Sequence, residues 1–184
     1  MIENIEKINR KFDQYLNIKF NDLKESNILL QDICEIKYGK SLEASKLQRD
    51  LKYSVYGGNG IIGTLDCYMF EDSKIAISCR GAASGNVILT EPYSSISSNS
   101  LYLNLYDSTM TLALYSYLKQ IRLSNYASGS AQPQITIDNL KLLKVPDFSS
   151  MKYNGQCVID IINSNNCKLK KLHQIKQLLL SKYF

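Results

Sequence analysis

The hydrophobic positions follow three different patterns along the chain. From Glu3 to about Leu23, apolar residues recur at helical spacing with charged residues between them, which predicts an amphipathic helix. From Ile28 to Phe70, short apolar stretches are broken by glycines, a pattern that favours strands joined by tight turns. From about Gly155 to the end, apolar residues alternate three and four positions apart, which predicts a second long helix.

The middle of the chain predicts further strands and one helix. Ile75–Ser78 and Val87–Thr90 are strand-like and are joined by a loop of small residues. Leu101–Tyr106 alternates apolar and polar side chains, as a half-buried strand does. A helix capped by Asp107 or Ser108 is expected to follow, because both residue types accept hydrogen bonds from the free N–H groups of a first turn.

That helix should end near Ser124, after which a polar loop begins. Together these patterns predict an α+β fold, with a mixed, β-rich domain and packed helices over residues 25–148. An N-terminal helix, residues 1–24, and a C-terminal helix, residues 149–184, would flank it. Because each terminal helix has an apolar stripe that the domain core need not cover, we expect the two to form a helical hairpin or coiled coil.

The C-terminal helix has a continuous seam for packing against another helix. Its positions are Val158, Ile162, Asn165, Leu169, Leu172, Lys176, Leu179 and Tyr183. Polar residues in such a seam usually set the register and the number of partners at some cost in stability, and we expect Asn165 to have this role. The seam residues other than Lys176 and Tyr183 are expected to form a dimer or partner interface.

The composition is that of an ordinary globular protein, with 45% hydrophobic and 21% charged residues. The N-terminus carries acids and lacks the apolar core of a signal peptide, and no later apolar run approaches the length of a membrane span. We therefore expect a cytoplasmic chain with no membrane partner.

The net charge of +5 is unevenly distributed. Residues 148–184 carry six Lys/Arg and one Asp/Glu, whereas residues 25–147 carry eleven and twelve. Within the middle, a local excess of cations precedes the first glycine-rich turn and consists of Lys37, Lys40, Lys46, Arg49 and Lys52 against Glu43 and Asp50. On charge alone, this cluster fits phosphate contacts and a solvated surface about equally well.

Residues suited to catalysis or metal binding are scarce. The cysteines form no Cys-x-x-Cys pair, and the single histidine, His173, lies on the predicted C-terminal helix, so metal sites, disulfides and histidine-dependent nucleophiles are disfavoured. Gly58–Gly63 matches G-x-G-x-x-G, but the residues after it favour a strand where a dinucleotide site needs a helix. A nuclease-type triplet can be drawn through Asp22, Glu35 and Lys37, yet such triplets arise easily by chance. We expect no catalytic residue and no cofactor.

A loop within Asn125–Pro146 is rich in hydroxyl and amide side chains, namely Ser128, Ser130, Gln132 and Gln134. Pro133 disfavours a helical backbone at the residue before it, and the apolar positions that follow anchor the loop to ordered structure. Hydroxyls and amides donate and accept hydrogen bonds but do little acid or base chemistry. The loop therefore suits recognition of a surface rather than bond cleavage.

Four motifs occur in order along the chain: Leu30–Lys40, Tyr56–Gly63, Ile75–Val87 and the segment from Gly129 to Pro146, which reads Gly-Ser-Ala-Gln-Pro-Gln-Ile and then Leu-Lys-Leu-Leu-Lys-Val-Pro. Their order and spacing resemble the target-recognition domain of type I restriction-modification specificity subunits. With the closing helix that ends Leu-Leu-Leu-Ser-Lys-Tyr-Phe, the resemblance covers nearly the whole chain.

The resemblance implies a non-catalytic, sequence-specific DNA-binding subunit. In this family a full subunit carries two such domains, held apart by paired helices, and each domain reads one half of a split site. This chain has one such domain, so it would be a half-length subunit that forms a homodimer through its helices, or part of a two-domain subunit. Adenine methylation and cleavage would come from methyltransferase (M) and restriction (R) subunits.

The residues expected to contact double-stranded DNA are cations for the phosphates and amides or hydroxyls for the base edges. They are Lys37, Lys40, Lys46, Asn59, Arg80, Ser84, Asn86, Asn99, Ser128, Ser130, Gln132 and Gln134. Arg80 fits a guanine or phosphate contact and equally a structural role in its own loop. A second hypothesis is a helical-hairpin module that binds protein and no DNA, which would fit the nearly neutral middle of the chain.

Overall fold

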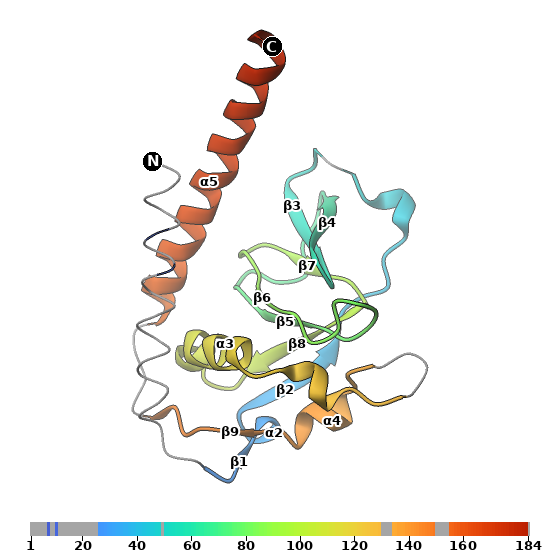
Figure 1. Cartoon of the computed structure of the whole chain (residues 1–184), viewed down its shortest axis with the longest axis vertical. Coiled ribbons are helices and arrows are strands. Elements are labelled where there is room, and N and C mark those ends of the chain that lie inside the picture. Colours follow the sequence, from blue (N-terminus) through green and yellow to red (C-terminus); the bar gives the residue numbers. More distant parts are fainter. Residues whose placement is uncertain are drawn as a thin grey trace.

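A four-stranded antiparallel sheet forms the centre of the molecule (Figure 1). The structure, a computed structural model, describes residues 7, 10, 26–48, 50–129, 134–149 and 155–183. In sheet order, the strands are β2 (Cys34–Tyr38), β8 (Ser100–Leu105), β5 (Ile75–Ser78) and β6 (Val87–Leu89). The prediction of strands at these places is confirmed, and β5 and β6 pair antiparallel across the loop of small residues.

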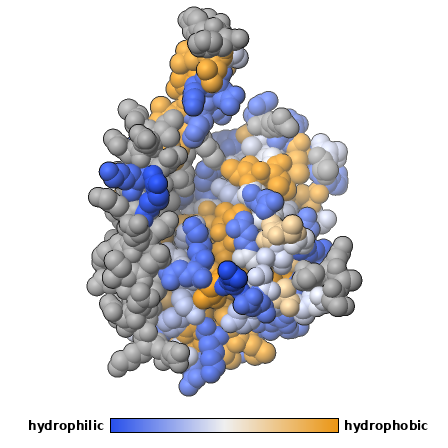
Figure 2. Space-filling view, viewed as in Figure 1, coloured by the Kyte–Doolittle hydropathy of each residue, from blue (hydrophilic) through white to orange (hydrophobic). Residues whose placement is uncertain are grey.

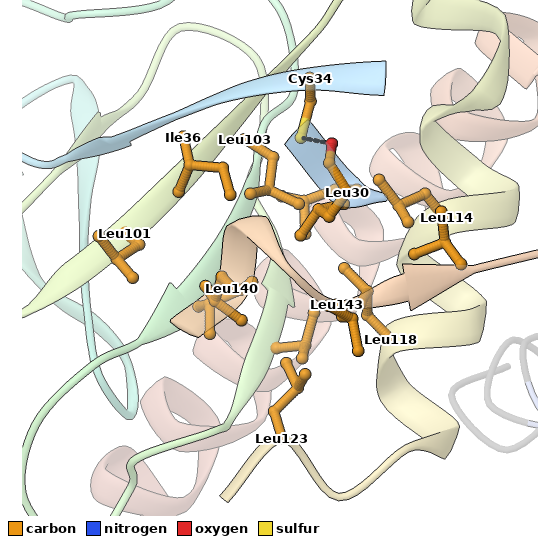
Figure 3. Packing of buried hydrophobic residues seen from close by; sticks show 14 of the residues in the cluster. Leu30, Cys34, Ile36, Leu101, Leu103, Leu114, Leu118, Leu123, Leu140 and Leu143 are labelled. Atoms are coloured by element: carbon orange, nitrogen blue, oxygen red, sulfur yellow. Dashed lines mark hydrogen bonds between the residues drawn. The ribbon is translucent and has the colours of Figure 1, made fainter. Parts of the chain in front are cut away.

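One face of this sheet carries the main hydrophobic core. Ile75 and Ile77 of β5 pair with Leu103 and Leu101 of β8, and all four side chains are fully buried because alternate residues of a strand share a face. The helices α3 (Thr111–Gln120) and α4 (Ile137–Lys141) add leucines to the same cluster (Figure 3). The core therefore joins segments from both halves of the domain.

The opposite face of the sheet packs against a smaller, three-stranded sheet. Its order is β4 (Gly60–Leu65), β3 (Tyr53–Gly57) and β7 (Ser95–Ile96). Tyr56 and Ile96 from the small sheet form a second buried cluster with Ala76 of β5. The Tyr56 hydroxyl accepts a hydrogen bond from the backbone N–H of Glu91 at 3.1 Å, and burial raises its pKa. The four-stranded sheet therefore lies between a helical layer and the three-stranded sheet.

The two ends of the domain are held together by β1 (Ile28–Leu29) and β9 (Lys144–Val145), which pair antiparallel. The short helix α2 (Leu30–Ile33) follows β1, and the Leu30 N–H donates to the Leu143 carbonyl at 2.8 Å. The Cys34 thiol donates to the Leu30 carbonyl at 3.3 Å (Figure 3), and burial raises its pKa to about 12. A thiol that stays protonated in this way has a packing role rather than a reactive one.

The C-terminal helix α5 (Gly155–Tyr183) confirms the predicted second long helix. It contacts α3 and the 3₁₀ turn η2 (Ser108–Met110), and the Asn163 amide donates to the Ser73 hydroxyl at 3.0 Å. Figure 1 shows its C-terminal part extending beyond the sheets. In the N-terminal segment, Lys7 and Arg10 are helical, and the rest of the helix predicted there lies outside the described residues, so the hairpin remains a prediction. None of the described helices is long and apolar enough to cross a membrane.

The helix predicted after β8 begins as expected but ends early. The Asp107 carboxylate accepts a hydrogen bond from the Thr109 N–H at 3.0 Å, so Asp107 caps the 3₁₀ turn η2 that leads into α3 at Thr111. However, α3 ends at Gln120 and not near Ser124, because Ile121 is extended and the chain turns so that Leu123 is buried in the 3₁₀ turn η3 (Leu123–Tyr126).

Neither α2, which lies where strands joined by turns were expected, nor the short helix α4 was predicted from the sequence. The Thr136 hydroxyl caps α4 by accepting from the Asn139 N–H at 3.3 Å, and its apolar residues belong to the main core. With only five residues, the helix is too short to show a period of 3.6.

Candidate nucleic-acid interface

Several chain segments meet at one end of the four-stranded sheet. The register pairs Tyr38 with Leu101, Ser78 with Ser100, and Ile77 with Val87, so the end of β2, the end of β5 and the starts of β6 and β8 lie together. The segments that continue from these strand ends are residues 39–40, 79–86 and 97–99. Each contains residues predicted from the sequence to contact DNA.

Backbone hydrogen bonds fix these segments to one another. The Cys79 N–H donates to the Asn99 carbonyl at 3.0 Å, and the Ser98 N–H donates to the Lys40 carbonyl at 2.9 Å. At Gly39 the chain passes so close to the carbonyls of Ile96 and Ser97 that a side chain would overlap them. The segments are therefore held in fixed relative positions.

The turn between β3 and β4 lies against the same end. The Asn86 amide donates to the Gly58 carbonyl at 3.1 Å. A Cβ at Gly58 would lie 2.6 Å from the Ser78 hydroxyl, so glycine permits this close approach. Asn59, at the tip of this turn, is thereby placed beside the loop that carries Arg80.

The loop that follows η3 joins this end from the other side. The Ile135 N–H donates to the Cys79 carbonyl at 3.1 Å, and the backbones of Ser128 and Gln134 exchange two hydrogen bonds of 2.8 Å. Gly85 has a φ of +90°, and a Cβ there would lie 2.7 Å from the Ser124 nitrogen. We call the assembled residues 39–40, 57–62, 78–86, 97–100 and 122–137 the recognition end, within which residues 130–133 lie outside the described part of the chain.

An open cavity of about 350 Å³ lies at the recognition end. Asn59, Arg80 and Asn99 line it, and the remaining lining residues are small: Gly58, Gly81, Ala82 and Ala83. The structure thus brings together one guanidinium and two carboxamides from three separate segments. These groups match the hydrogen-bonding edges of guanine and adenine, whereas a polar pocket of this kind has no acid or base for catalysis.

The charge of the recognition end differs from that of the whole domain. The segments that form it contain no aspartate or glutamate, although residues 25–147 as a whole carry twelve. Lys40, Arg80 and Arg122 form no ion pair with any other residue that the structure describes. The free cations therefore give this end a positive field suited to an anionic partner.

Two predicted phosphate contacts lie in other surroundings. The Lys37 ammonium pairs with the Glu35 carboxylate at 2.9 Å, and this hydrogen bond together with the charge of Glu35 raises the pKa of Lys37. Lys46 pairs with Glu43 at 3.2 Å on the turn η1 (Ala44–Lys46), beside a different cavity of about 490 Å³. The sequence cluster of cations is thus divided in space.

The remaining predicted contacts differ in how accessible they are. The Ser84 hydroxyl is buried and has no hydrogen-bond partner among the described residues, so it does not face solvent. Asn86 uses its amide N–H to hold the turn at Gly58. Ser128 and Gln134 belong to the recognition end, whereas Ser130 and Gln132 fall outside the described residues.

Sequence reasoning missed Arg122 and Tyr126. Arg122 is exposed directly before η3, and Tyr126 is 39% exposed within it, next to the loop that carries Ser128. Neither residue lies in a motif. They join the recognition end because Gly85 packs against η3, and no spacing in the sequence reports that contact.

Comparisons with known proteins agree on one family. A family model described as "Type I restriction modification DNA specificity domain" matches residues 8–146. The chain is 24% identical over 170 residues to the "Type I restriction enzyme EcoprrI specificity subunit" of Escherichia coli, covering 89% of this chain and 42% of that protein. This chain therefore spans less than half the length of that relative.

Solved structures show the same fold. The S subunit of a type I restriction-modification system from M. genitalium matches with a TM-score of 0.66 and 20% identity, over 89% of this chain and 45% of that one. The HsdS subunit from Thermoanaerobacter tengcongensis matches with a TM-score of 0.53 and 16% identity, over 98% of this chain and 54% of that one. With the family match over most of its length, the chain belongs to the family of type I restriction modification DNA specificity domains.

Proposed function

We propose that this chain is the DNA-recognition component of a type I restriction-modification complex and reads one half of a bipartite site. The recognition end carries this proposal, because it collects guanidinium, ammonium, amide and hydroxyl groups from segments that contain no aspartate or glutamate. Such a surface attracts the phosphate backbone and offers the donors and acceptors that base edges require.

The groups at the recognition end divide into two roles. Lys40 and Arg122, which are exposed and unpaired among the described residues, would contact phosphates and set the orientation of the duplex. Arg80, Asn59 and Asn99 line one cavity and would meet base edges, the amides preferring adenine and the guanidinium preferring guanine. Ser128, Gln134 and the undescribed loop between them would extend this contact.

The chemistry of the complex would come from other subunits. In this proposal residues 25–148 form the recognition domain, and residues 149–184 contact methyltransferase (M) subunits and, through them, restriction (R) subunits. These partners would methylate adenine or cleave DNA with their own cofactors. This chain would select the site where they act.

The first prediction tests the phosphate contacts. Replacing Lys40 with alanine should weaken binding to all duplexes and reduce the salt slope of log K by about one, because one phosphate contact and its released counterions are lost. Replacing Lys37 should have little effect, because its ammonium is already paired with Glu35. Binding is measured by mobility shift over a range of salt concentrations, with a duplex enriched from a random-sequence pool.

Two outcomes would contradict these assignments. If the Lys40→Ala variant and the wild type have equal salt slopes, Lys40 does not contact a phosphate. Failure to enrich any duplex, with the chain alone and with a methyltransferase subunit, would contradict DNA recognition and favour the protein-binding module.

The exposed end of α5 supports a proposal about assembly. The seam residues Asn165, Leu169 and Leu172 are partly buried, whereas Leu179 is 53% exposed. Ile175 and Leu180 are also exposed there, and Figure 2 shows apolar side chains gathered on this projecting part of the helix. We propose that a second copy of the chain covers this end, so that two recognition domains stand at a fixed distance.

The second prediction tests this assembly. Replacing Leu179 with glutamate should halve the mass measured by sedimentation equilibrium, because a carboxylate in an apolar seam must be buried without a partner. Leu178→Glu is the matched control, since Leu178 is equally apolar and 68% exposed but lies off the seam. The proposal that the seam forms a dimer interface would be contradicted if the wild-type chain sediments as a monomer or if the two variants have equal effects.

A further inference from the structure

The tip of the β3–β4 hairpin exposes two neighbouring isoleucines. Ile61 is 44% exposed and Ile62 is 48% exposed. Consecutive residues of a regular strand point to opposite faces, but the register here shifts, since Val55 pairs with Gly63 while Tyr56 pairs with Ile61. Ile62 is therefore the extra residue of a β-bulge, a feature that redirects side chains near binding sites.

The hairpin tip is held firmly in place. Ile62 lies across Gly57, where an added Cβ would come within 2.7 Å of the Ile62 Cγ2 atom. The Gly58 carbonyl accepts the hydrogen bond from Asn86, and Tyr56, opposite Ile61, is buried. Ile62 thus covers part of the turn, and both isoleucines remain about half exposed on a backbone that is fixed in place.

The surroundings of Ile61 indicate what it contacts. Asn59, two residues before it, lines the cavity that also contains Arg80 and Asn99, and the recognition end has no carboxylate. Amide and guanidinium groups match the polar atoms of base edges in the major groove. The apolar group that those edges present is the C5-methyl of thymine, so an exposed isoleucine two residues after Asn59 has a complementary partner there.

We propose that Ile61 contacts the C5-methyl group of a thymine in the major groove and thereby favours an A·T pair at one position of the site. The inference rests on the proposed function, because it requires the recognition end to face duplex DNA. It assigns Ile61 as a specificity-determining residue, with Ile62 as the residue that supports the turn beneath it.

The test removes the methyl group from the DNA rather than from the protein. The duplex enriched from the random pool is prepared with thymine and with uracil, which differ only in the C5-methyl group. Binding of the wild-type chain should weaken about fourfold for each contacted methyl that is lost, as expected for burial of one carbon. The protein is unchanged in this comparison, so loss of folding cannot explain the result.

Ile61→Ala completes the comparison. This variant should bind the thymine duplex more weakly than wild type and should no longer distinguish thymine from uracil. Ile161→Ala is the matched control, because Ile161 is 53% exposed on α5, outside the recognition end, and its variant should retain the thymine preference. Thermal unfolding of the three proteins verifies that each is folded.

Two results would overturn the inference while leaving the proposed function in place: equal wild-type affinity for thymine and uracil duplexes, or a thymine preference that persists unchanged in Ile61→Ala. Absence of binding to every duplex would instead contradict the proposed function itself, and with it the role of Ile61.

Discussion

Replacing Arg80 with alanine is expected to weaken binding to the enriched duplex by about tenfold to a hundredfold, the usual value of a bidentate contact to a base. The Arg80 guanidinium is exposed, lines the cavity with Asn59 and Asn99, and forms no ion pair with any residue described in the structure. Its removal therefore breaks no described internal salt bridge, and the loss should appear in affinity rather than in stability. Fluorescence anisotropy with labelled duplex measures the effect.

Arg80→Lys separates the two roles open to this residue. Lysine keeps the charge but lacks the planar fork, so a phosphate contact should largely survive and a guanine contact should not. Each G·C pair of the duplex is then substituted in turn. If Arg80 contacts a guanine, the wild-type chain should lose affinity when one particular pair is changed, whereas the affinity of the Arg80 variants should not fall further at that pair. If the Arg80→Ala variant binds with the same affinity as the wild type, Arg80 does not contact the DNA and has only a structural role in its loop.

Replacing Gly39 with alanine is expected to lower the free energy of unfolding by about 3 kcal/mol, the upper part of the range for forcing extra atoms into a packed site. The added Cβ would overlap the carbonyl oxygens of Ile96 and Ser97, which are backbone atoms fixed in the bridge to Lys40. Backbone atoms cannot turn aside as a flexible side chain does. The clash must therefore separate residues 39–40 from the turn at 97–99.

The matched control for this prediction is Gly81→Ala. Gly81 has a φ of +71°, and a Cβ there would meet nothing within 4 Å, so its cost is limited to backbone strain of about 1–2 kcal/mol. Urea unfolding of both variants gives the comparison. If Gly39→Ala is no less stable than Gly81→Ala, the close packing at Gly39 is not essential. Because Lys40 follows Gly39 directly, duplex binding should fall together with stability.

The recognition end shows which of the predicted contact residues lie together. Asn59, Arg80 and Asn99 were predicted from the chemistry of their side chains and lie in three separate parts of the sequence. The structure places all three around one cavity. Their roles toward DNA remain predictions, but their convergence on one surface is what those roles require.

The same reasoning was less informative for charges. Lys37 and Lys46 belong to a sequence cluster of cations, yet each is paired with a nearby acid, whereas Arg122 lies in no cluster and is placed at the recognition end. Charge counted along a sequence records which ions are present and not which of them are neutralised by neighbours. Pairing depends on side-chain direction and on contacts across the fold.

By itself, the sequence determined most of the elements and the types of chemical group: strands from alternation, the long C-terminal helix from its seam, the Asp107 cap, and turns that carry amides. These properties depend on local periodicity and residue type, which can be read directly from the sequence. Only the tertiary structure decided that α3 ends at Gln120, that the short helix α4 forms, and which polar turns share one surface. Those outcomes depend on burial of Leu123 and on backbone contacts between distant segments, such as Cys79 with Asn99 and Ile135, and no local pattern encodes such contacts.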